Sequence, residues 1–387
     1  MNVVLLSPHF PAHMSRYARG LKELGVNVLG LADEPPQFLP PQVRESLTDY
    51  FYVADMHQYD DLVRACGQIT WKYGKIDRID SLNEYWLETE AALRTDFNVA
   101  GIHDDTIRQV KAKSEMKRLF LQHGIPCARG QIVASLQEAM SFVREVGYPV
   151  VLKPDVGVGA SHTWRADNDE TLQQLFAHKP DKLFILEEYI DGQICTFDGL
   201  TDRSGQPVFY TSMVYSEGVM EVVNSDNHIY YYTLRQLPSD LEALGSKMLE
   251  IFDVRERFFH FEFFRRHSDG QLVALEVNMR PPGGPSIDMM NYGHDLDLYR
   301  EWAHVLVHNH FNSAVNRKYF CCYAGRKHAK SYRYSHESIV HHFSPYLVDH
   351  GFMPAVFRQA MGDEFYLFRC EDEADVIEIS HYIQELA

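Results

Sequence analysis

The chain has 387 residues, more than a single hydrophobic core usually organises, so we expect two or three packed units. Hydrophobic residues make up 45% of the sequence and charged residues 24%, as in ordinary globular proteins. The net charge of -17 argues against a nucleic acid or an anionic membrane as a partner, because both bind to cationic surfaces.

The N-terminal sequence predicts neither export nor membrane insertion. The first ten residues, MNVVLLSPHF, lack the basic region and the small-residue cleavage site of a secretory signal. No apolar stretch reaches the length that spans a bilayer. The six cysteines have no CxxC spacing and the twenty histidines no HExxH spacing, which favours free thiols in a reducing cytosol and no zinc site. We therefore expect a cytoplasmic protein.

Residues 1–100 alternate between strand-like and helix-like patterns. Apolar runs predict strands at 2–6, 27–31, 50–53 and 78–82, with helices at 14–24, 59–73 and 87–96. This alternation is typical of a parallel, doubly wound sheet. The first turn has no GxGxxG motif, so we do not expect a dinucleotide there. Ser7 and His9 either face a ligand or only form the turn before the next helix.

Residues 101–310 predict mixed α+β layering. A helix at 106–123 precedes the break Gly124-Ile125-Pro126, a strand follows at 131–133, and a long helix is expected at 241–252. Residues 311–387 predict a small appended unit, with strands at 319–323, 355–357 and 364–368 and a final helix at 373–386. The sequence contains no flexible Gly/Ser linker, so the units should pack against one another.

The first chemical motif is a lysine followed by a loop of small residues. Lys153 ends the apolar run 147–153, and Gly157, Gly159 and Ser161 follow in the loop 157–163. Glycines let the backbone approach closely, successive N–H groups can hold phosphate oxygens, and the lysine supplies a charge. The lysine precedes the glycines, so this is not a Walker loop. The alternative is a plain strand and turn.

The second motif is an apolar strand that ends in acidic residues. Glu187 and Glu188 close the run 184–188, and Tyr189 and Ile190 resume it before Asp191-Gly192. This pattern suits an adenine slot, in which backbone groups pair with the base and apolar side chains enclose its ring. The alternative is an ordinary strand whose glutamates face solvent.

The third motif is a hairpin rich in carboxylates. A strand at 260–264, a turn at 268–270 and a returning strand at 272–280 are predicted. Glu276, Asn278 and Arg280 alternate along the second strand and share a face that Glu262 can reach from the first. Two carboxylates and an amide form an all-oxygen site suited to Mg²⁺, and Arg280 can stabilise developing negative charge. The alternative is a solvent-facing side of the hairpin.

In order, spacing and residue type the three motifs resemble the ATP-grasp superfamily over residues 2–310. The resemblance implies a Rossmann-like domain at 1–100, an ATP-grasp domain at 101–310 with a lid at about 120–187, and a small C-terminal α+β unit at 311–387. Lys113, before Gly124-Ile125-Pro126, is similar to the first ATP lysine, and Lys153 to the second. One position departs from the family pattern, because Ile194 stands where a ribose-binding glutamate is usual. Ribose binding would then either fall to another group, such as Asp198 or Gln193, or be weaker.

The family resemblance implies an ATP-dependent carboxylate–amine ligase that forms an amide or peptide bond through an acyl phosphate. ATP would be bound by Lys113, Lys153, the loop and residues 187–190, and Mg²⁺, or Mn²⁺ in its place, by Glu262, Glu276 and Asn278. Arg280 would be the catalytic residue. Small carboxylate and amine substrates are expected, and a homodimer is common in the family. The general base stays open among Glu217, Asp288 and His294. Two alternatives also stay open: a carboxylase using bicarbonate, and an ATP-binding regulatory protein without turnover.

Overall fold

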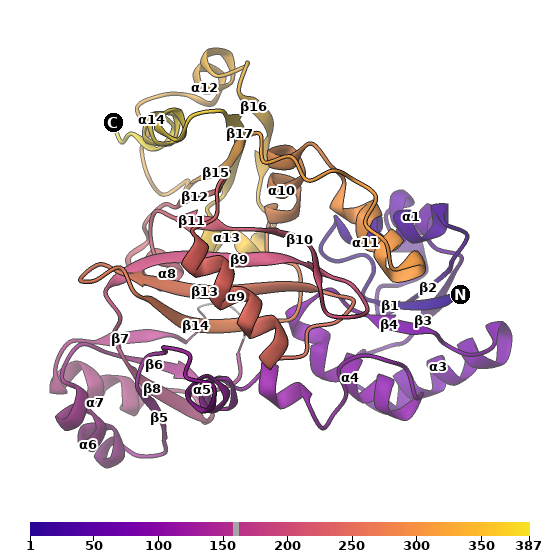
Figure 1. Ribbon diagram of the computed structural model, residues 1–387, viewed down its shortest axis with the longest axis horizontal. Coiled ribbons are helices and arrows are strands. Elements are labelled where there is room, and N and C mark those ends of the chain that lie inside the picture. Colours follow the sequence, from indigo (N-terminus) through magenta and orange to yellow (C-terminus); the bar gives the residue numbers. More distant parts are fainter. Residues whose placement is uncertain (158–161) are drawn as a thin grey trace.

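The computed structural model describes residues 1–157 and 162–387. The chain forms three sheets, with a parallel one on the right of Figure 1, a small antiparallel one at its lower left, and a large antiparallel one between them. Among the described residues, no helix combines the length and the apolar character needed to cross a membrane.

The N-terminal sheet has the order β3-β2-β1-β4, and all of its strand pairs are parallel. This confirms the doubly wound arrangement predicted from the alternation of strands and helices. Its elements are β1 (Asn2–Leu6), α1 (Met14–Glu23), β2 (Asn27–Ala32), η1 (Pro36–Phe38), α2 (Pro41–Ser46), β3 (Asp49–Tyr52), α3 (Tyr59–Tyr73), β4 (Arg78–Asp80), η2 (Glu84–Trp86) and α4 (Leu87–Asp96).

The small sheet has the order β5-β8-β6-β7 and is antiparallel throughout. Two helices, α6 and α7, cover its outer face (Figure 1), and their apolar side chains form a core of their own with the strands. The elements of this segment are η3 (Ile107–Val110), α5 (Lys113–Gln122), β5 (Gly130–Val133), α6 (Leu136–Val146), β6 (Val150–Pro154), β7 (Trp164–Ala166), α7 (Asp169–His178) and β8 (Phe184–Glu188).

The large sheet has the path β14-β13-β9-β11-β12-β15-β17-β16, with β10 paired to β9. Its first part is built from β9 (Gly192–Thr201), β10 (Pro207–Thr211), β11 (Met213–Tyr215), α8 (Val219–Ser225), β12 (Tyr230–Thr233), α9 (Ser239–Ile251), β13 (Phe258–Arg266), β14 (Leu272–Asn278), α10 (Ser286–His294) and α11 (Leu298–His308). The predicted hairpin is confirmed, because β13 and β14 pair antiparallel with Glu262 opposite Glu276.

The C-terminal strands continue the large sheet. β15 pairs with β12 on one side and with β17 on the other, and β16 forms the edge. The elements here are β15 (Phe320–Arg326), α12 (His336–His342), β16 (Leu347–Phe352), η4 (Ala355–Phe357), α13 (Arg358–Met361), β17 (Glu364–Cys370) and α14 (Glu373–Gln384). The domain boundaries drawn from the sequence stay a prediction.

Helix α11 returns to the N-terminal sheet and packs against α1. Tyr17 of α1 lies edge-on to Trp302 of α11, with ring centroids 5.4 Å apart. Gly20 allows this close approach, since a Cβ there would lie 3.0 Å from the carbonyl oxygen of Tyr299. Both faces of β1 are buried, one against α1 and α11 and the other against α3 and α4, as expected of a parallel strand.

Two predicted elements were wrong. The helix expected at 106–123 is divided, because Ala112 is extended and α5 begins afresh at Lys113. Asp155, from beyond β6, accepts hydrogen bonds from the N–H and hydroxyl of Ser114 at 2.7 and 2.9 Å, and so caps the new helix. The strand expected at 355–357 is the 3-10 turn η4, which Pro354 precedes, and the strand of this region is β16.

Candidate ATP-binding and metal site

A cavity lies between the small sheet and the large one. Residues from β6, β8, β13 and β14 line it together with the start of α5 and with α8. The structure therefore brings together residues that the sequence places 163 positions apart, from Lys113 to Glu276. The predicted residues on its wall are Lys113, Lys153, Glu187, Glu188, Tyr189, Ile190, Glu262 and Glu276.

Lysines and carboxylates are paired inside this cavity. The Nζ of Lys113 lies 3.1 Å from Glu276, and the Nζ of Lys153 lies 2.7 Å from Glu187. Lys117 holds the other oxygen of Glu187 at 3.2 Å. Burial would raise the pKa of Glu187, but the charges of Lys153 and Lys117 outweigh it and the pKa is lowered. The cavity thus contains buried ammonium groups close to carboxylates, and the Glu187 carboxylate is held in its ionised form.

The segment 187–190 forms a wall of mixed character. Arg129 fixes the Glu188 carboxylate, with its backbone N–H and its guanidinium each at 2.7 Å. The N–H of Glu188 donates to the Arg129 carbonyl at 3.0 Å, which ties this segment to the chain before β5. Ile190 packs in an apolar cluster with Ala128 and Val273. Such a wall can hold a flat, heteroaromatic ring.

The small-residue loop is only partly described. Gly157 follows β6, and among the described residues an added Cβ at this glycine would meet only the Pro154 side chain, at 3.5 Å or more. Gly159 and Ser161 lie outside the described residues. Thr163, at the far end of the loop, lines the cavity. The prediction that this loop holds phosphates therefore remains a prediction.

The hairpin places an all-oxygen donor set at one end of the cavity. Glu262 and Glu276 are directly opposite each other across β13 and β14, and the Asn278 amide donates to Glu262 at 3.3 Å. No group of three or more His, Cys, Asp or Glu side chains suited to a metal occurs among the described residues. Two carboxylates and an amide fit a hard cation whose remaining ligands are phosphate oxygens and water.

A buried histidine, His260, contacts the Glu262 carboxylate. The Nδ1 of His260 lies 2.5 Å from Asp198, and its Nε2 lies 3.1 Å from Glu262. Burial would lower the pKa of His260, but the Asp198 carboxylate outweighs it and raises the pKa to about 9. The imidazolium therefore fixes one oxygen of Glu262 and leaves the other for a ligand.

Arg280 lies beside this donor set and is held by a residue of the N-terminal unit. Its Nε lies 3.1 Å from Glu84, and one terminal nitrogen lies 3.4 Å from the Asn278 amide oxygen. Lys111 holds the same Glu84 carboxylate at 2.6 Å. The guanidinium that could face a reacting carboxylate is thus oriented across the boundary between two sheets.

Several weaker candidates lie elsewhere. Asp198 is fully buried and bonded to His260, and Gln193 is exposed, while Ile194 lines the cavity. Glu217 is exposed, and His294 is buried with its Nδ1 on the Met290 carbonyl. The remaining candidates lie outside the cavity wall: Asp288, Ser7 and His9.

Sequence reasoning missed Lys117, His260, Glu84 and Glu221, which the structure places in or around the site. Two of them carried a signal. Lys117 lies one helical turn after Lys113, and His260 shares a strand face with Glu262. Glu84 and Glu221 had none, because they reach the site from other units of the fold.

Comparison with known proteins agrees with this geometry. Residues 146–288 match the ATP-grasp domain. The L-arginine-specific L-amino acid ligase of Bacillus subtilis is 22% identical over 285 residues, which cover 69% of this chain and 67% of that protein.

Two solved structures share the fold over nearly their whole length. The L-amino acid ligase of Bacillus licheniformis has a TM-score of 0.75 at 14% identity, covering 98% of this chain and 96% of its own. The N5-carboxyaminoimidazole synthetase of Staphylococcus aureus has a TM-score of 0.70, also at 14% identity and with the same coverage. The chain therefore has the ATP-grasp fold, and its residues 146–288 match the ATP-grasp domain.

Proposed function

We propose that this protein is an ATP-dependent carboxylate–amine ligase. The observation that carries the proposal is the cavity in which Lys113 and Lys153 meet Glu262 and Glu276, with Arg280 beside them. Ammonium groups suited to phosphates and carboxylates suited to a divalent cation occur together where a nucleoside triphosphate needs both. Two of the similar proteins are named L-amino acid ligases, which supports an amino acid as one substrate.

The reaction would proceed in two balanced steps. A carboxylate oxygen of the first substrate attacks the γ-phosphorus, the bond to the bridging oxygen breaks, and ADP leaves. The nitrogen of the amine then attacks the carbonyl carbon of the acyl phosphate, inorganic phosphate leaves, and the amine loses a proton. Catalysis of this kind depends mainly on positioning and on neutralising charge.

Different residues of the cavity would bind the phosphates, the adenine, the cation and the substrate. Lys113 and Lys153 would release Glu276 and Glu187 and turn to the phosphates, and residues 187–190 would hold the adenine. Glu262, Glu276 and Asn278 would hold Mg²⁺, or Mn²⁺, which neutralises charge on the phosphate oxygens when bound. Arg280 would orient the substrate carboxylate and stabilise negative charge on its oxygen.

A carboxylase is the second candidate function. The structural similarity to the biotin carboxylase domain of a Hydrogenobacter thermophilus 2-oxoglutarate carboxylase favours it, with a TM-score of 0.67 at 14% identity, a likeness that concerns the fold. In that case bicarbonate would take the place of the organic carboxylate. A regulatory protein that binds ATP without turnover is the third alternative.

A substrate screen separates these functions. The protein would be incubated with ATP, Mg²⁺ and pooled amino acids in bicarbonate-free buffer, and phosphate release would be measured with and without added bicarbonate. The ligase predicts release that depends on amino acids and not on bicarbonate. Release that requires bicarbonate would identify a carboxylase, and no substrate-dependent release from any pool would leave the regulatory protein.

A further inference from the structure

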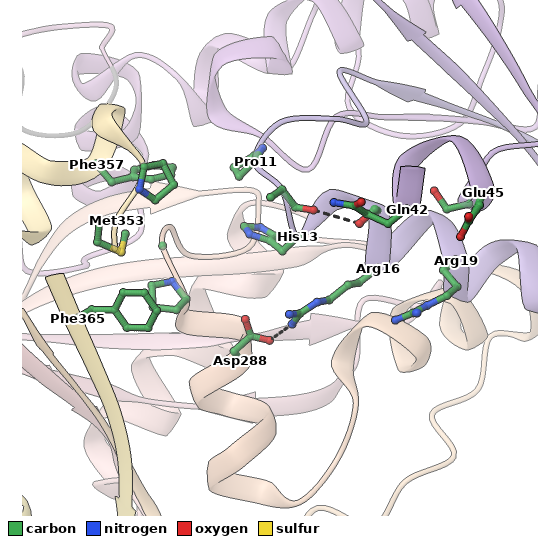
Figure 2. A pocket seen from close by; sticks show the side chains of 16 residues that line it. Pro11, His13, Arg16, Arg19, Gln42, Glu45, Asp288, Met353, Phe357 and Phe365 are labelled. Atoms are coloured by element: carbon green, nitrogen blue, oxygen red, sulfur yellow. Dashed lines mark hydrogen bonds and ion pairs between the residues drawn. The ribbon is translucent and has the colours of Figure 1, made fainter. Parts of the chain in front are cut away.

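A second cavity, of about 520 Å³, lies where the N-terminal unit meets the C-terminal half of the large sheet. Figure 2 shows that three units contribute to it: α1 and α2 of the N-terminal unit, the start of α10, and the C-terminal strands and turn. Its volume lies within the range of about 300–1,000 Å³ typical of small-molecule sites. None of the residues assigned to ATP or metal lines it.

One wall of this cavity is apolar. Met353, Phe357 and Phe365 form it, and Figure 2 shows them together on the side away from α1 and α2. Phe357 is fixed by Phe10, whose ring stacks on it at 6.5 Å. Such a wall removes an apolar group of a ligand from water but offers nothing to a charged one.

The opposite wall is charged, with both signs in equal number. Arg16 and Arg19 project from α1, while Glu45 comes from α2 and Asp288 from α10. Arg16 pairs with Asp288, yet its guanidinium has further donors. Arg19 has no ion pair or hydrogen bond among residues 1–157 and 162–387. Burial and the charge of Arg16 lower the pKa of His13 to about 4, so this histidine adds no charge to the cavity near neutral pH.

The cavity lies close to the proposed reaction centre. Gly284 and Pro285 line it, and Gly284 is four residues after Arg280. An extended chain of four residues spans at most about 14 Å. A row of stacked aromatic rings also runs between the reaction centre and this cavity, from Tyr215 through Tyr231 and Tyr323 to Phe365. Burial raises the pKa of Tyr215, and the charges of Glu262 and Arg280 also act on it, which places this ring near the reaction centre.

We propose that this cavity binds the acceptor of the ligation, an amino acid with an apolar side chain. Its α-carboxylate would bind Arg16 and Arg19, its amino group would face Asp288, and its side chain would pack on Met353, Phe357 and Phe365. This inference rests on the proposed ligase function. The balance of two cations and two anions suits a zwitterion, whereas a phosphate monoester such as a ribonucleotide would meet Glu45 and Asp288 with like charge.

Ligand-observed NMR titration of the full chain tests the proposal without turnover. The probes are L-phenylalanine, 3-phenylpropanoate without the amino group, phenethylamine without the carboxylate, and ribose 5-phosphate. We expect L-phenylalanine to bind most tightly. Arg16→Gln and Asp288→Asn should each weaken it by about tenfold or more, because each removes a charge-assisted hydrogen bond.

Arg300→Gln is the matched control. Arg300, in α11, pairs with Glu23 of α1, the helix that carries Arg16, but it lies outside the cavity. It should leave L-phenylalanine binding unchanged. Phe357→Ala provides a test that keeps both charges, and it should weaken L-phenylalanine while L-alanine binds as before.

Three results would overturn the proposal: no amino acid binds, ribose 5-phosphate binds more tightly than L-phenylalanine, or the affinity is the same in all variants. The substrate screen distinguishes this failure from failure of the ligase. Amino-acid-dependent phosphate release without an effect of these variants would refute the cavity alone. Binding that follows the variants, without any phosphate release, would refute the ligase instead.

Discussion

Glu276 is the residue on which the metal and the nucleotide assignments meet. It lies opposite Glu262 on the hairpin and pairs with Lys113 at 3.1 Å. Glu276→Gln keeps the size of the side chain but removes its charge, so both cation binding and the release of Lys113 are affected. We predict that amino-acid-dependent phosphate release falls at least about a hundredfold, as expected when a divalent cation loses a carboxylate. Glu250→Gln, on the exposed face of α9, is the control. Turnover that survives in the Glu276 variant would disprove the metal assignment.

His294 makes a prediction about pH rather than about activity. Its side chain is buried, and burial lowers its pKa to about 4. Between about pH 4 and 6.5, His294 is therefore protonated in the unfolded chain, where its pKa is an ordinary 6.5 or so, and neutral in the folded chain. Stability contributed by neutral His294 is complete above about pH 6.5 and is lost as the pH falls toward 4, by roughly 2 kcal/mol between pH 6.5 and 5.

Urea unfolding at pH 7 and pH 5 measures this dependence. His294→Gln keeps a donor for the Met290 carbonyl but does not titrate. We expect a smaller loss of unfolding free energy between the two pH values than in the unchanged protein. His341→Gln, at an exposed position, should leave the loss as it was. An equal loss in both variants would show that His294 is not the source.

At the scale of elements, Arg280 depends on a partner outside its own strand. The Glu84 carboxylate, in the turn η2, holds both Arg280 and Lys111 while almost fully buried. We predict that Glu84→Gln lowers kcat by about tenfold to a hundredfold, because the guanidinium loses its charged anchor, while the KM for ATP is unchanged. Glu88→Gln, exposed on the adjoining helix α4, is the control. A rise in the KM for ATP with kcat preserved would contradict a positioning role.

Packing of α9 on the large sheet gives a stability prediction. Gly245 of α9 lies against Phe197 of β9, and a Cβ there would approach the ring to 2.3 Å. Gly245→Ala should lower the free energy of unfolding by about 1–3 kcal/mol, because the buried ring cannot move away freely. Gly67→Ala on α3 meets nothing within 4 Å and should instead raise it by about 0.5–1 kcal/mol. Shifts of the urea midpoint in opposite directions, relative to the unchanged protein, would confirm the contrast.

The sequence predicted those elements whose pattern is local. The parallel N-terminal sheet follows from its alternation, and the hairpin of β13 and β14 follows from apolar runs around Ser268-Asp269-Gly270. The division of the helix at Ala112 could not be predicted, because the cap is supplied by Asp155 from another part of the chain. The link from Glu84 to Arg280 spans 196 positions and is invisible to any pattern of spacing for the same reason.

At the scale of the whole molecule, the candidate site is made by the meeting of two sheets. Lys153 and Glu187 belong to the small sheet, while Glu262 and Glu276 belong to the large one. A ligand that contacts both sheets would connect two parts of the fold whose strands are not hydrogen-bonded into one sheet. Ion pairs inside the cavity, such as Lys113 with Glu276, compensate its buried charges, and phosphates and a cation would take over that compensation on binding.

Nucleotide binding should therefore stabilise the whole chain. A ligand present at a hundred times its Kd raises the free energy of unfolding by about 2.7 kcal/mol, which ADP with Mg²⁺ should show as a higher urea midpoint. Removing Mg²⁺ with a chelator should reduce the shift, because the ADP oxygens then face Glu262 and Glu276 without a cation between them. Lys153→Met should also reduce it, since a buried phosphate partner is lost, whereas Lys182→Met, exposed before β8, should not. An undiminished shift in the Lys153 variant would mean that the nucleotide binds outside the cavity between the two sheets.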